Sequence, residues 1–483
     1  MRRILNIRLI QRHRRRARLL LYLVPSAFLG AGGAYVLWAH RVHNQRPWVY
    51  VDYTEFESVR LFQRYLQINT SYPTGNEIPG AEFLARELRK DGIEARVERL
   101  GHRNANLWAI LEGDDPRALV LHNHIDVDPI PDPRPWRAPP MSGRINLPFI
   151  YGRGAFDMKS LAIAQLMTMK NLRREGARLR RSLVFLATGD EERDSWLGTR
   201  WFLRQHEDVV RRFDVVLTEG GAIEATDVGT VKHWGTENRQ KLYVDVWVCS
   251  GNRGALEALR KDLVLPERLT RGHPDRLPEP IVESLRRYVS SRERPDFETF
   301  LESALWWRGG FDGLPFNVQA AMRHELSAFP VEVDPDGGGY LMRVVLQLLP
   351  WEPVEDGLHG VLPGGLPGFG TAIDIPHGPI PEVGLEHPIF DHIDAYMGKA
   401  YPGIVHGPLF VPWAATDARF FRAAGIPAFG FSPFLILTGD AGKITGPDER
   451  MVAPSFIEGL EIFDGVVRTW VEASTETSAT GTM

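Results

Sequence analysis

The chain has 483 residues, of which 43% are hydrophobic and 24% are charged. This is the composition of a folded protein rather than a disordered one, and the length predicts more than one domain. The formal net charge is −4, but residues 1–18 carry eight arginines and no acid, so the remainder carries −12, which argues against nucleic acid as a partner.

The first predicted element is a membrane anchor. Residues 19–39 (LLLYLVPSAFLGAGGAYVLWA) carry no charge and, at about 1.5 Å per helical residue, are long enough to cross a hydrocarbon layer of roughly 30 Å. The basic tail 1–18 predicts a cytoplasmic N-terminus and an extracytoplasmic body. A cleaved signal peptide and an organelle transit peptide are the alternatives. Residues 40–55 would form a short stalk.

Between residues 56 and 240 the sequence alternates between strand and helix patterns. Such alternation predicts an α/β fold with a buried, mostly parallel sheet flanked by helices. The patterns typical of strands lie at 108–113, 118–126, 182–188 and 213–221, and those typical of amphipathic helices lie at 81–92 and 160–176.

The pattern changes near Lys241. A half-exposed strand at 242–249 is followed by a long Arg- and Pro-rich stretch, expected to be helical to about Pro330, and by a further strand at 340–350. We therefore predict a smaller domain with its own sheet, inserted at 241–375. The first pattern then returns at 376–472, and we expect a disordered tail at 473–483. The later predicted elements are helices at 387–403, 417–425 and 453–473 and a strand at 427–434.

The strand at 182–188 runs directly into an acidic stretch, ATGDEER at 187–193. Its carboxylates, including Glu191 and Glu192, repel one another at neutral pH. Either water solvates them on an exposed turn, or a cation offsets their charge.

Related side chains follow other strands. His124 and Asp126 follow an apolar strand and point the same way, because side chains alternate along an extended chain. Asp157 lies in a Gly-rich turn before a helix, and Glu219 lies at a further strand end. Sites in open α/β sheets form outside the carboxyl ends of the strands, so one rim should collect these groups. A histidine with several carboxylates and no cysteine suits zinc, manganese or cobalt.

These motifs resemble those of the co-catalytic di-zinc peptidase family of aminoacylase and carboxypeptidase S, and most of all its branch of carboxypeptidase S and the N-fatty-acyl-amino-acid hydrolases. The resemblance covers residues 55–240 and 385–470. It implies that the inserted domain is a ferredoxin-like α+β lid or dimerisation domain, which would pair two chains. The matching stretches are HIDVDP (124–129), Trp136, YGRGAFDMKS (151–160), TGDEE (188–192), TEGG (218–221) and ATDARFFRAAGIPAFGFSPF (415–434).

The resemblance also implies a role for each matching residue. His124, Asp157 and Glu219 would hold one zinc ion, and Asp157 would bridge to a second ion held also by Glu192. Asp126 would hydrogen-bond His124 from behind and fix its tautomer. Glu191 would be the general base that takes a proton from metal-activated water.

The chain departs from the family at the second metal and in the lid. The late motif I-H-G-x-x-E reads KITGPDERM at 443–451, so Thr445 replaces a ligand histidine and the second site is degenerate; His406 is a weak candidate to replace it. The lid's glycine–histidine pair is replaced by Asn252 and Arg253, and Gln347 stands at the place of an arginine. Arg419 is retained and is expected to bind a substrate carboxylate. Arg253 is expected to bind the substrate from the lid.

Two functions remain open from the sequence. The first is a membrane-anchored, zinc-dependent amidohydrolase that cleaves a small peptide or an N-acyl amino acid. The second is a catalytically impaired relative that binds or senses a ligand. Glu191 and Asp126 favour the amidohydrolase. The binding or sensing protein is favoured by Thr445, Asn252 and Gln347.

Overall fold

A computed structural model describes residues 51–263, 282, 323–335, 337–362, 365–375, 387–411, 415–437 and 439–472. The predicted tail 1–18, the anchor 19–39, most of the stalk and the C-terminal tail 473–483 lie outside these residues. Among the helices that the structure describes, none is both long and apolar enough to span a membrane.

The larger unit is built on a ten-stranded mixed sheet with the order β1-β2-β6-β3-β7-β16-β9-β8-β17, in which β15 also pairs with β9. Its centre, β6-β3-β7-β16, is parallel. The ten strands are β1 (Ala95–Leu100), β2 (Asn104–Leu111), β3 (Asp115–His124), β6 (Arg181–Thr188), β7 (Phe213–Thr218), β8 (Ala222–Asp227), β9 (Thr230–Gln240), β15 (Val405–Val411), β16 (Ala428–Gly430) and β17 (Leu435–Leu437).

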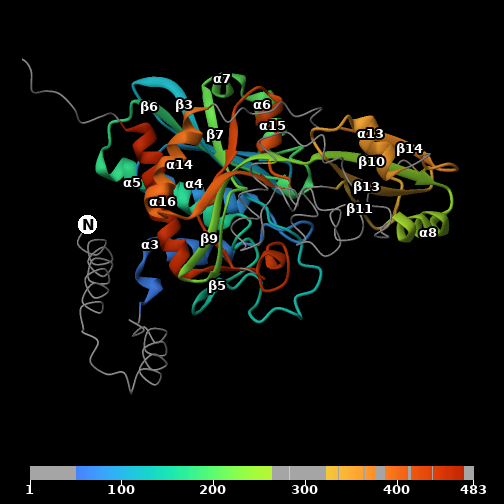
Figure 1. Cartoon of the computed structure of the whole chain (residues 1–483), viewed down its shortest axis with the longest axis horizontal. Helices are drawn as coiled ribbons and strands as arrows, with labels where there is room; N and C mark the ends of the chain where they lie inside the picture. Colours follow the sequence, from blue (N-terminus) through green and yellow to red (C-terminus); the bar gives the residue numbers. More distant parts are fainter. Residues whose placement is uncertain are drawn as a thin grey trace, which may run out of the picture. The chain divides into compact units, whose positions relative to one another are not determined.

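Helices cover both faces of this sheet, because its central strands are apolar on both sides (Figure 1). On β3, Val120 packs with Leu186 and Phe421 on one face, while the alternate residues Leu119 and Leu121 are buried on the other. One face carries α6 (Thr199–Gln205), α7 (Glu207–Val210) and α15 (Ala418–Ala423), and the other carries α3 (Glu57–Leu66), α4 (Ile78–Arg89), α5 (Lys159–Glu175), α14 (Pro388–Ala400) and α16 (Ala453–Val471).

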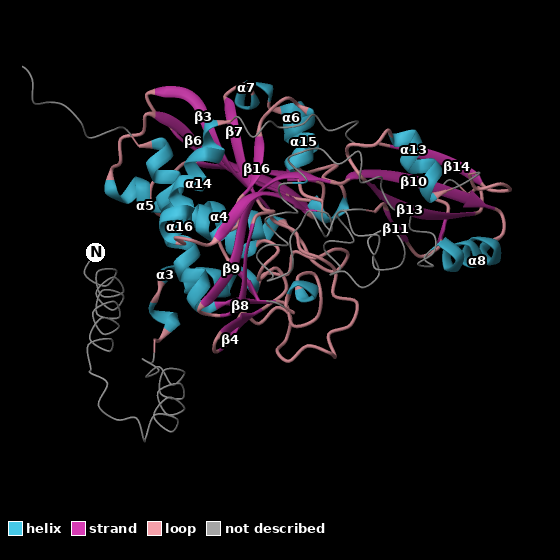
Figure 2. Cartoon of the chain, viewed as in Figure 1, coloured by secondary structure: helices cyan, strands magenta, loops and turns pink. Residues whose placement is uncertain are grey.

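The inserted unit has a second, antiparallel sheet with the order β11-β13-β10-β14 (Figure 2). Its described elements run strand–helix–strand–strand–helix–strand, which is the ferredoxin-like arrangement. They are β10 (Leu242–Ser250), α8 (Arg253–Leu263), β11 (Glu325–Ala328), β13 (Tyr340–Leu348), α13 (Val354–Val361) and β14 (Gly370–Asp374), with the short β12 (Glu332–Val333) beside β13.

The predicted fold class is therefore confirmed: a mostly parallel sheet flanked by helices, with a smaller α+β lid. The expectation of helix up to Pro330 is wrong at 325–328, where β11 pairs with β13, and residues 264–281 and 283–322 lie outside the described part. The remaining described elements form a small sheet and three short 3-10 turns: β4 (Arg144–Asn146), β5 (Phe149–Tyr151), β18 (Arg450–Val452), η1 (Tyr53–Glu55), η2 (Glu191–Arg193) and η6 (Ala441–Lys443).

Candidate metal centre and active site

The carboxyl ends of three neighbouring parallel strands deliver the acidic site. β3 ends at His124, Glu219 follows the last residue of β7, and Glu191 stands three residues beyond the end of β6. Asp157 reaches the same place from the turn that precedes α5. The structure thus brings the predicted residues together at one rim, as expected for an open α/β sheet.

The imidazole of His124 faces the carboxylates with one nitrogen. Its Nε2 lies 3.0 Å from Oδ1 of Asp157 and 3.7 Å from Oε2 of Glu219. His124 belongs to two sets of possible metal ligands, and within each set the ligand atoms all lie within 4.8 Å of one another. The first set is His124, Glu191 and Glu219, and the second is His124, Asp157 and Glu192. One imidazole and four carboxylates make a donor set that fits zinc or another small dication.

The electrostatics of the cluster also fit a cation. Burial, followed by the charge of Asp157, raises the pKa of Glu219 to about 7, and burial raises the pKa of Glu191 and Glu192 well above the ordinary value. Burial would raise the pKa of Asp157 too, but the hydrogen bond and charge of His124 lower it overall. Oε1 of Glu192 is buried and has no hydrogen-bond partner among the described residues. These groups need protons or a cation to offset their charge.

Asp126 does not hold His124 in the predicted way. Nδ1 of His124 lies 3.0 Å from the main-chain oxygen of Asp126, whereas the nearer carboxylate oxygen is 3.7 Å away. The Asp126 carboxylate instead accepts the main-chain N–H groups of Glu191 at 3.1 Å and Glu192 at 3.0 Å. The carbonyl therefore fixes the histidine tautomer, and the carboxylate holds the acidic turn against the end of β3.

A buried network behind the site holds the same turn. Asp417 accepts hydrogen bonds from Ser195 at 2.5 Å and Thr199 at 2.6 Å. His122 is fully buried between the hydroxyls of Thr218 at 2.8 Å and Thr188 at 3.0 Å, and burial lowers its pKa to about 4. Neutral at physiological pH, His122 ties the ends of β6 and β7 together. Its Nε2 lies 3.6 Å from Oδ2 of Asp417, and His122 belongs to neither set of candidate metal ligands.

Glu449 is a site residue that the sequence analysis did not single out. It is 1% exposed and accepts hydrogen bonds from Arg153 Nη1 at 2.9 Å and from the main-chain N–H groups of Gly154, Phe156 and Asp157 at 2.9, 2.8 and 3.1 Å. It thereby fixes the turn that carries Asp157. The available signal was the glutamate position in the I-H-G-x-x-E motif, four residues beyond Thr445.

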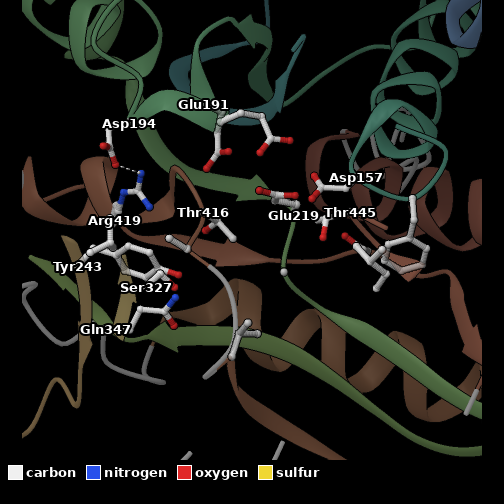
Figure 3. A pocket seen from close by; sticks show the side chains of 18 of the residues that line it. Asp157, Glu191, Asp194, Glu219, Tyr243, Ser327, Gln347, Thr416, Arg419 and Thr445 are labelled. Atoms are coloured by element: carbon white, nitrogen blue, oxygen red, sulfur yellow. Dashed lines mark hydrogen bonds and ion pairs between the residues drawn. The ribbon is translucent and has the colours of Figure 1, made fainter. Parts of the chain in front are cut away.

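Thr445 lies at the wall of the cavity beside Asp157 (Figure 3). Its main-chain oxygen accepts a hydrogen bond of 2.8 Å from Arg153. The side chain presents one neutral hydroxyl, which is a poor zinc ligand compared with an imidazole. His406 does not replace it: its ring stacks on Trp234 at 4.3 Å and pairs with Asp394 at 3.3 Å, and it does not line the cavity.

The cavity has a volume of about 340 Å³ and is closed on one side by the lid. Its catalytic wall carries the acids together with Thr416 and Arg419, and its lid wall carries Tyr243, Ser327 and Gln347 (Figure 3). A chamber of this size, walled by apolar and polar groups and ending on the acids, suits a small organic substrate.

Arg253 does not reach this cavity within one chain. Tyr243, near the start of β10, lines the cavity, whereas Arg253 begins α8 beyond the opposite end of that strand. The seven residue-to-residue steps from Tyr243 to Ser250 span about 23 Å at 3.3 Å per step. The guanidinium of Arg253 instead lies 6.0 Å from the ring of Tyr340.

Residues 120–469 match the family described as Peptidase family M20/M25/M40. The chain belongs to this family. Aminoacylase-1 of Sus scrofa is 26% identical over 427 residues, covering 85% of this chain and 94% of the relative, and Aminoacylase-1A of Rattus norvegicus is 25% identical over 86% and 95%. The predicted membership of the aminoacylase and carboxypeptidase type is thus confirmed, and the chain is a metal-dependent hydrolase.

Two solved structures share the fold. The M20 family metallo-carboxypeptidase Sso-CP2 from Sulfolobus solfataricus aligns with a TM-score of 0.61 at 16% identity, over 86% of this chain and 99% of that one. Human carnosine dipeptidase 1 aligns with a TM-score of 0.58 at 14% identity, over 85% and 96%. M20 enzymes typically bind zinc, and the donor set around His124 matches that requirement.

Proposed function

We propose that this M20 hydrolase cleaves the amide bond of an N-acyl amino acid or a small peptide. The observation that carries the proposal is the meeting of His124 with four carboxylates that line a cavity whose other wall is formed by the lid. The similarity to aminoacylases over nearly their whole length supports the substrate class.

The residues divide into a metal-holding set and a proton-transfer group. His124, Asp157 and Glu219 would hold a first zinc ion, and Asp157 with Glu192 would hold a second. Bound zinc supplies a polarised amide carbonyl and a water whose pKa is lowered towards 7. Glu191 takes the proton from the attacking water and delivers it to the leaving amide nitrogen. A carboxylate oxygen of Glu191 lies within 4.8 Å of ligand atoms of His124 and Glu219, and this proximity to the metal-holding residues supports the role.

The second ion is expected to be held more weakly than the first. Thr445 offers a hydroxyl where the family has a histidine, so the second site keeps two protein carboxylates and water. Manganese or cobalt would suit such an oxygen-rich site as well as zinc. We propose one firmly bound metal and one that exchanges readily.

The attachment to a membrane is part of the same proposal. The uncharged segment 19–39 and the basic tail before it support a single-pass anchor with the catalytic body outside the cytoplasm. A lid-mediated homodimer stays a prediction. It would be tested by the molecular mass of the detergent-solubilised chain.

The second candidate function is a ligand-binding module without turnover. Thr445 favours it, as does Gln347, whose buried amide oxygen has no partner among the described residues. Such a protein would keep the cavity and one metal but lack the groups that stabilise the transition state.

Metal analysis combined with a hydrolysis assay separates the two functions. The purified chain would be assayed for zinc by mass spectrometry and for cleavage of a panel of N-acyl amino acids and dipeptides. Cleavage that Glu191→Gln abolishes, at unchanged zinc content, supports the hydrolase. Bound zinc without turnover of any member of the panel would instead support the binding module, and the absence of tightly bound metal would contradict both.

A further inference from the structure

The position of the second metal lacks a strong ligand on the side of Thr445. Asp157 and Glu192 form one set of possible ligands with His124, and Thr445 lies at the cavity wall beside Asp157 (Figure 3). Oε1 of Glu192 is buried and has no hydrogen-bond partner among the described residues. Because a neutral hydroxyl binds a dication weakly, a third strong ligand has to come from another segment of the chain.

The segment that follows β3 brings Asp128 to this side of the site. Nη2 of Arg153 donates to the main-chain oxygen of Thr445 at 2.8 Å and to that of Pro129 at 3.4 Å. The segment that carries Asp128, directly before Pro129, therefore runs beside the segment that carries Thr445. The carboxyl group of Asp128 lies within hydrogen-bonding distance of Glu192.

Two carboxyl groups in contact need positive charge between them. Asp128 and Glu192 repel each other when both are ionised, and the charge of Asp157 acts on both of them. Either a shared proton or a bound cation relieves this repulsion. A dication offsets two negative charges where one proton offsets a single charge, so the arrangement favours a metal ion among the three acids.

We propose that Asp128 is the third protein ligand of the second metal ion, in place of the histidine that Thr445 replaces. The inference rests on the metal site of the proposed hydrolase and assigns to it a residue from outside the matching ligand set. In the metal-free chain Asp128 belongs to neither set of ligand atoms within 4.8 Å. Its side chain is only partly buried, so the carboxylate can turn towards a cation beside Asp157 and Glu192.

This assignment gives the two metal positions different chemistry. Asp128, Asp157 and Glu192 offer the second ion only oxygen ligands, whereas the first position keeps the imidazole of His124. Carboxylate oxygens suit manganese and magnesium, and an imidazole suits zinc. The chain should therefore hold zinc at His124 and accept a manganese ion at the second position.

The test measures binding of manganese to the full chain loaded with one equivalent of zinc. Calorimetry and electron paramagnetic resonance give the affinity and the stoichiometry without any need for turnover. Asp128→Asn should weaken manganese binding by roughly 10- to 100-fold and leave the zinc content unchanged. The matched control is Asp132→Asn in the same loop, where Asp132 pairs with Arg134 at 2.8 Å and the two side chains are 42% and 88% exposed. The control should change the affinity by less than about threefold.

Asp128→His separates ligation from charge, because it removes the carboxylate but supplies an imidazole. If Asp128 is a ligand, this variant should bind the second ion more tightly than Asp128→Asn does and should prefer zinc to manganese. Equal weakening in the two variants would mean that Asp128 acts through its charge alone and would overturn the inference.

Two further outcomes would also reject Asp128 as a ligand. If Asp128 only shares a proton with Glu192, Asp128→Asn should leave manganese binding unchanged or tighten it. A parent chain that binds no manganese beside its zinc would likewise contradict the inference. Hydrolysis is assayed separately on the panel of N-acyl amino acids. Cleavage by the parent with unchanged manganese affinity in Asp128→Asn would reject the ligand and keep the hydrolase, whereas binding through Asp128 without any cleavage would reject the hydrolase and keep the ligand.

Discussion

Substitution of Glu449 tests whether a residue that touches no metal in our proposal controls the metal site. Glu449 is buried with Arg153 and holds the turn of residues 152–157 by three main-chain hydrogen bonds. Glu449→Ala leaves a buried guanidinium without its carboxylate and three N–H groups without their acceptor. We expect a less stable protein whose Asp157 is no longer fixed.

The magnitude follows from the contacts that are lost. Breaking a buried ion pair by removing one partner costs about 3–5 kcal/mol, and a main-chain N–H left without an acceptor costs about 1 kcal/mol or more unless water replaces it. Water can replace the lost acceptor at two of the three N–H groups, so Glu449→Ala should lower the free energy of unfolding by about 4–6 kcal/mol, close to the whole stability of many domains. Glu449→Gln keeps the shape and one acceptor oxygen, so its cost should be about half as large.

The assay is urea unfolding of the metal-free chain at pH 7, followed by circular dichroism, with zinc content measured on the reloaded protein. Glu207→Ala is the control, because Glu207 pairs with Arg211 on the surface, where the two side chains are 72% and 76% exposed. That variant should change stability by less than about 1 kcal/mol. If Glu449→Ala also stays within 1 kcal/mol of the parent and retains its zinc, the role assigned to Glu449 is wrong.

Three further predictions concern the metal and proton chemistry. Glu191→Gln should lower kcat by at least about 100-fold at unchanged zinc content, and an unchanged kcat would reject it as the base. Thr445→His should raise the metal content towards two ions per chain after dialysis, while a stoichiometry equal to that of the parent would show that Thr445 does not limit the second site. Glu219 has a pKa of about 7 in the folded, metal-free chain, against an ordinary value of 4.5. Between pH 4.5 and pH 7 the folded state therefore keeps a proton on Glu219 that the unfolded state has lost. The contribution of Glu219 to the free energy of unfolding should therefore fall by about 3 kcal/mol as the pH rises from 4.5 to 7. It is measured as the difference in unfolding free energy between the parent and Glu219→Gln, and a difference that does not change with pH would contradict the prediction.

Residues at strand ends could be placed from the sequence because two simple geometric rules apply to them. Side chains alternate along a strand, and the carboxyl ends of parallel strands share one edge of the sheet. His124 and Glu219 follow directly from these rules, and Asp157 follows from its turn before a helix. The second sheet was predictable in a similar way, because the hydrophobic pattern changes at Lys241, next to the start of β10.

The contacts between distant segments could not be predicted from local pattern. The main-chain oxygen of Asp126 is closer to His124 than the carboxylate is, and this depends on how the chain turns after β3. Glu449 lies nearly 300 residues from the turn that it holds. Arg253 was placed near the substrate by resemblance alone, and the length of β10 keeps it away from the cavity of its own chain. Such details need the folded geometry.

The charge of the cluster bears on the number of metals more directly than any single ligand does. The carboxylates of Asp157, Glu191, Glu192 and Glu219 carry four negative charges when fully ionised, and His124 is neutral when it binds a metal. One dication leaves two of these charges uncompensated. In the metal-free chain burial raises the pKa of Glu191, Glu192 and Glu219, so that protons can compensate charge that no metal offsets. The second metal therefore competes with protons, and its occupancy should rise with pH. Thr445 weakens that site without removing its charge, so the loss of one histidine lowers the affinity for a second ion but leaves the electrostatic demand for it in place.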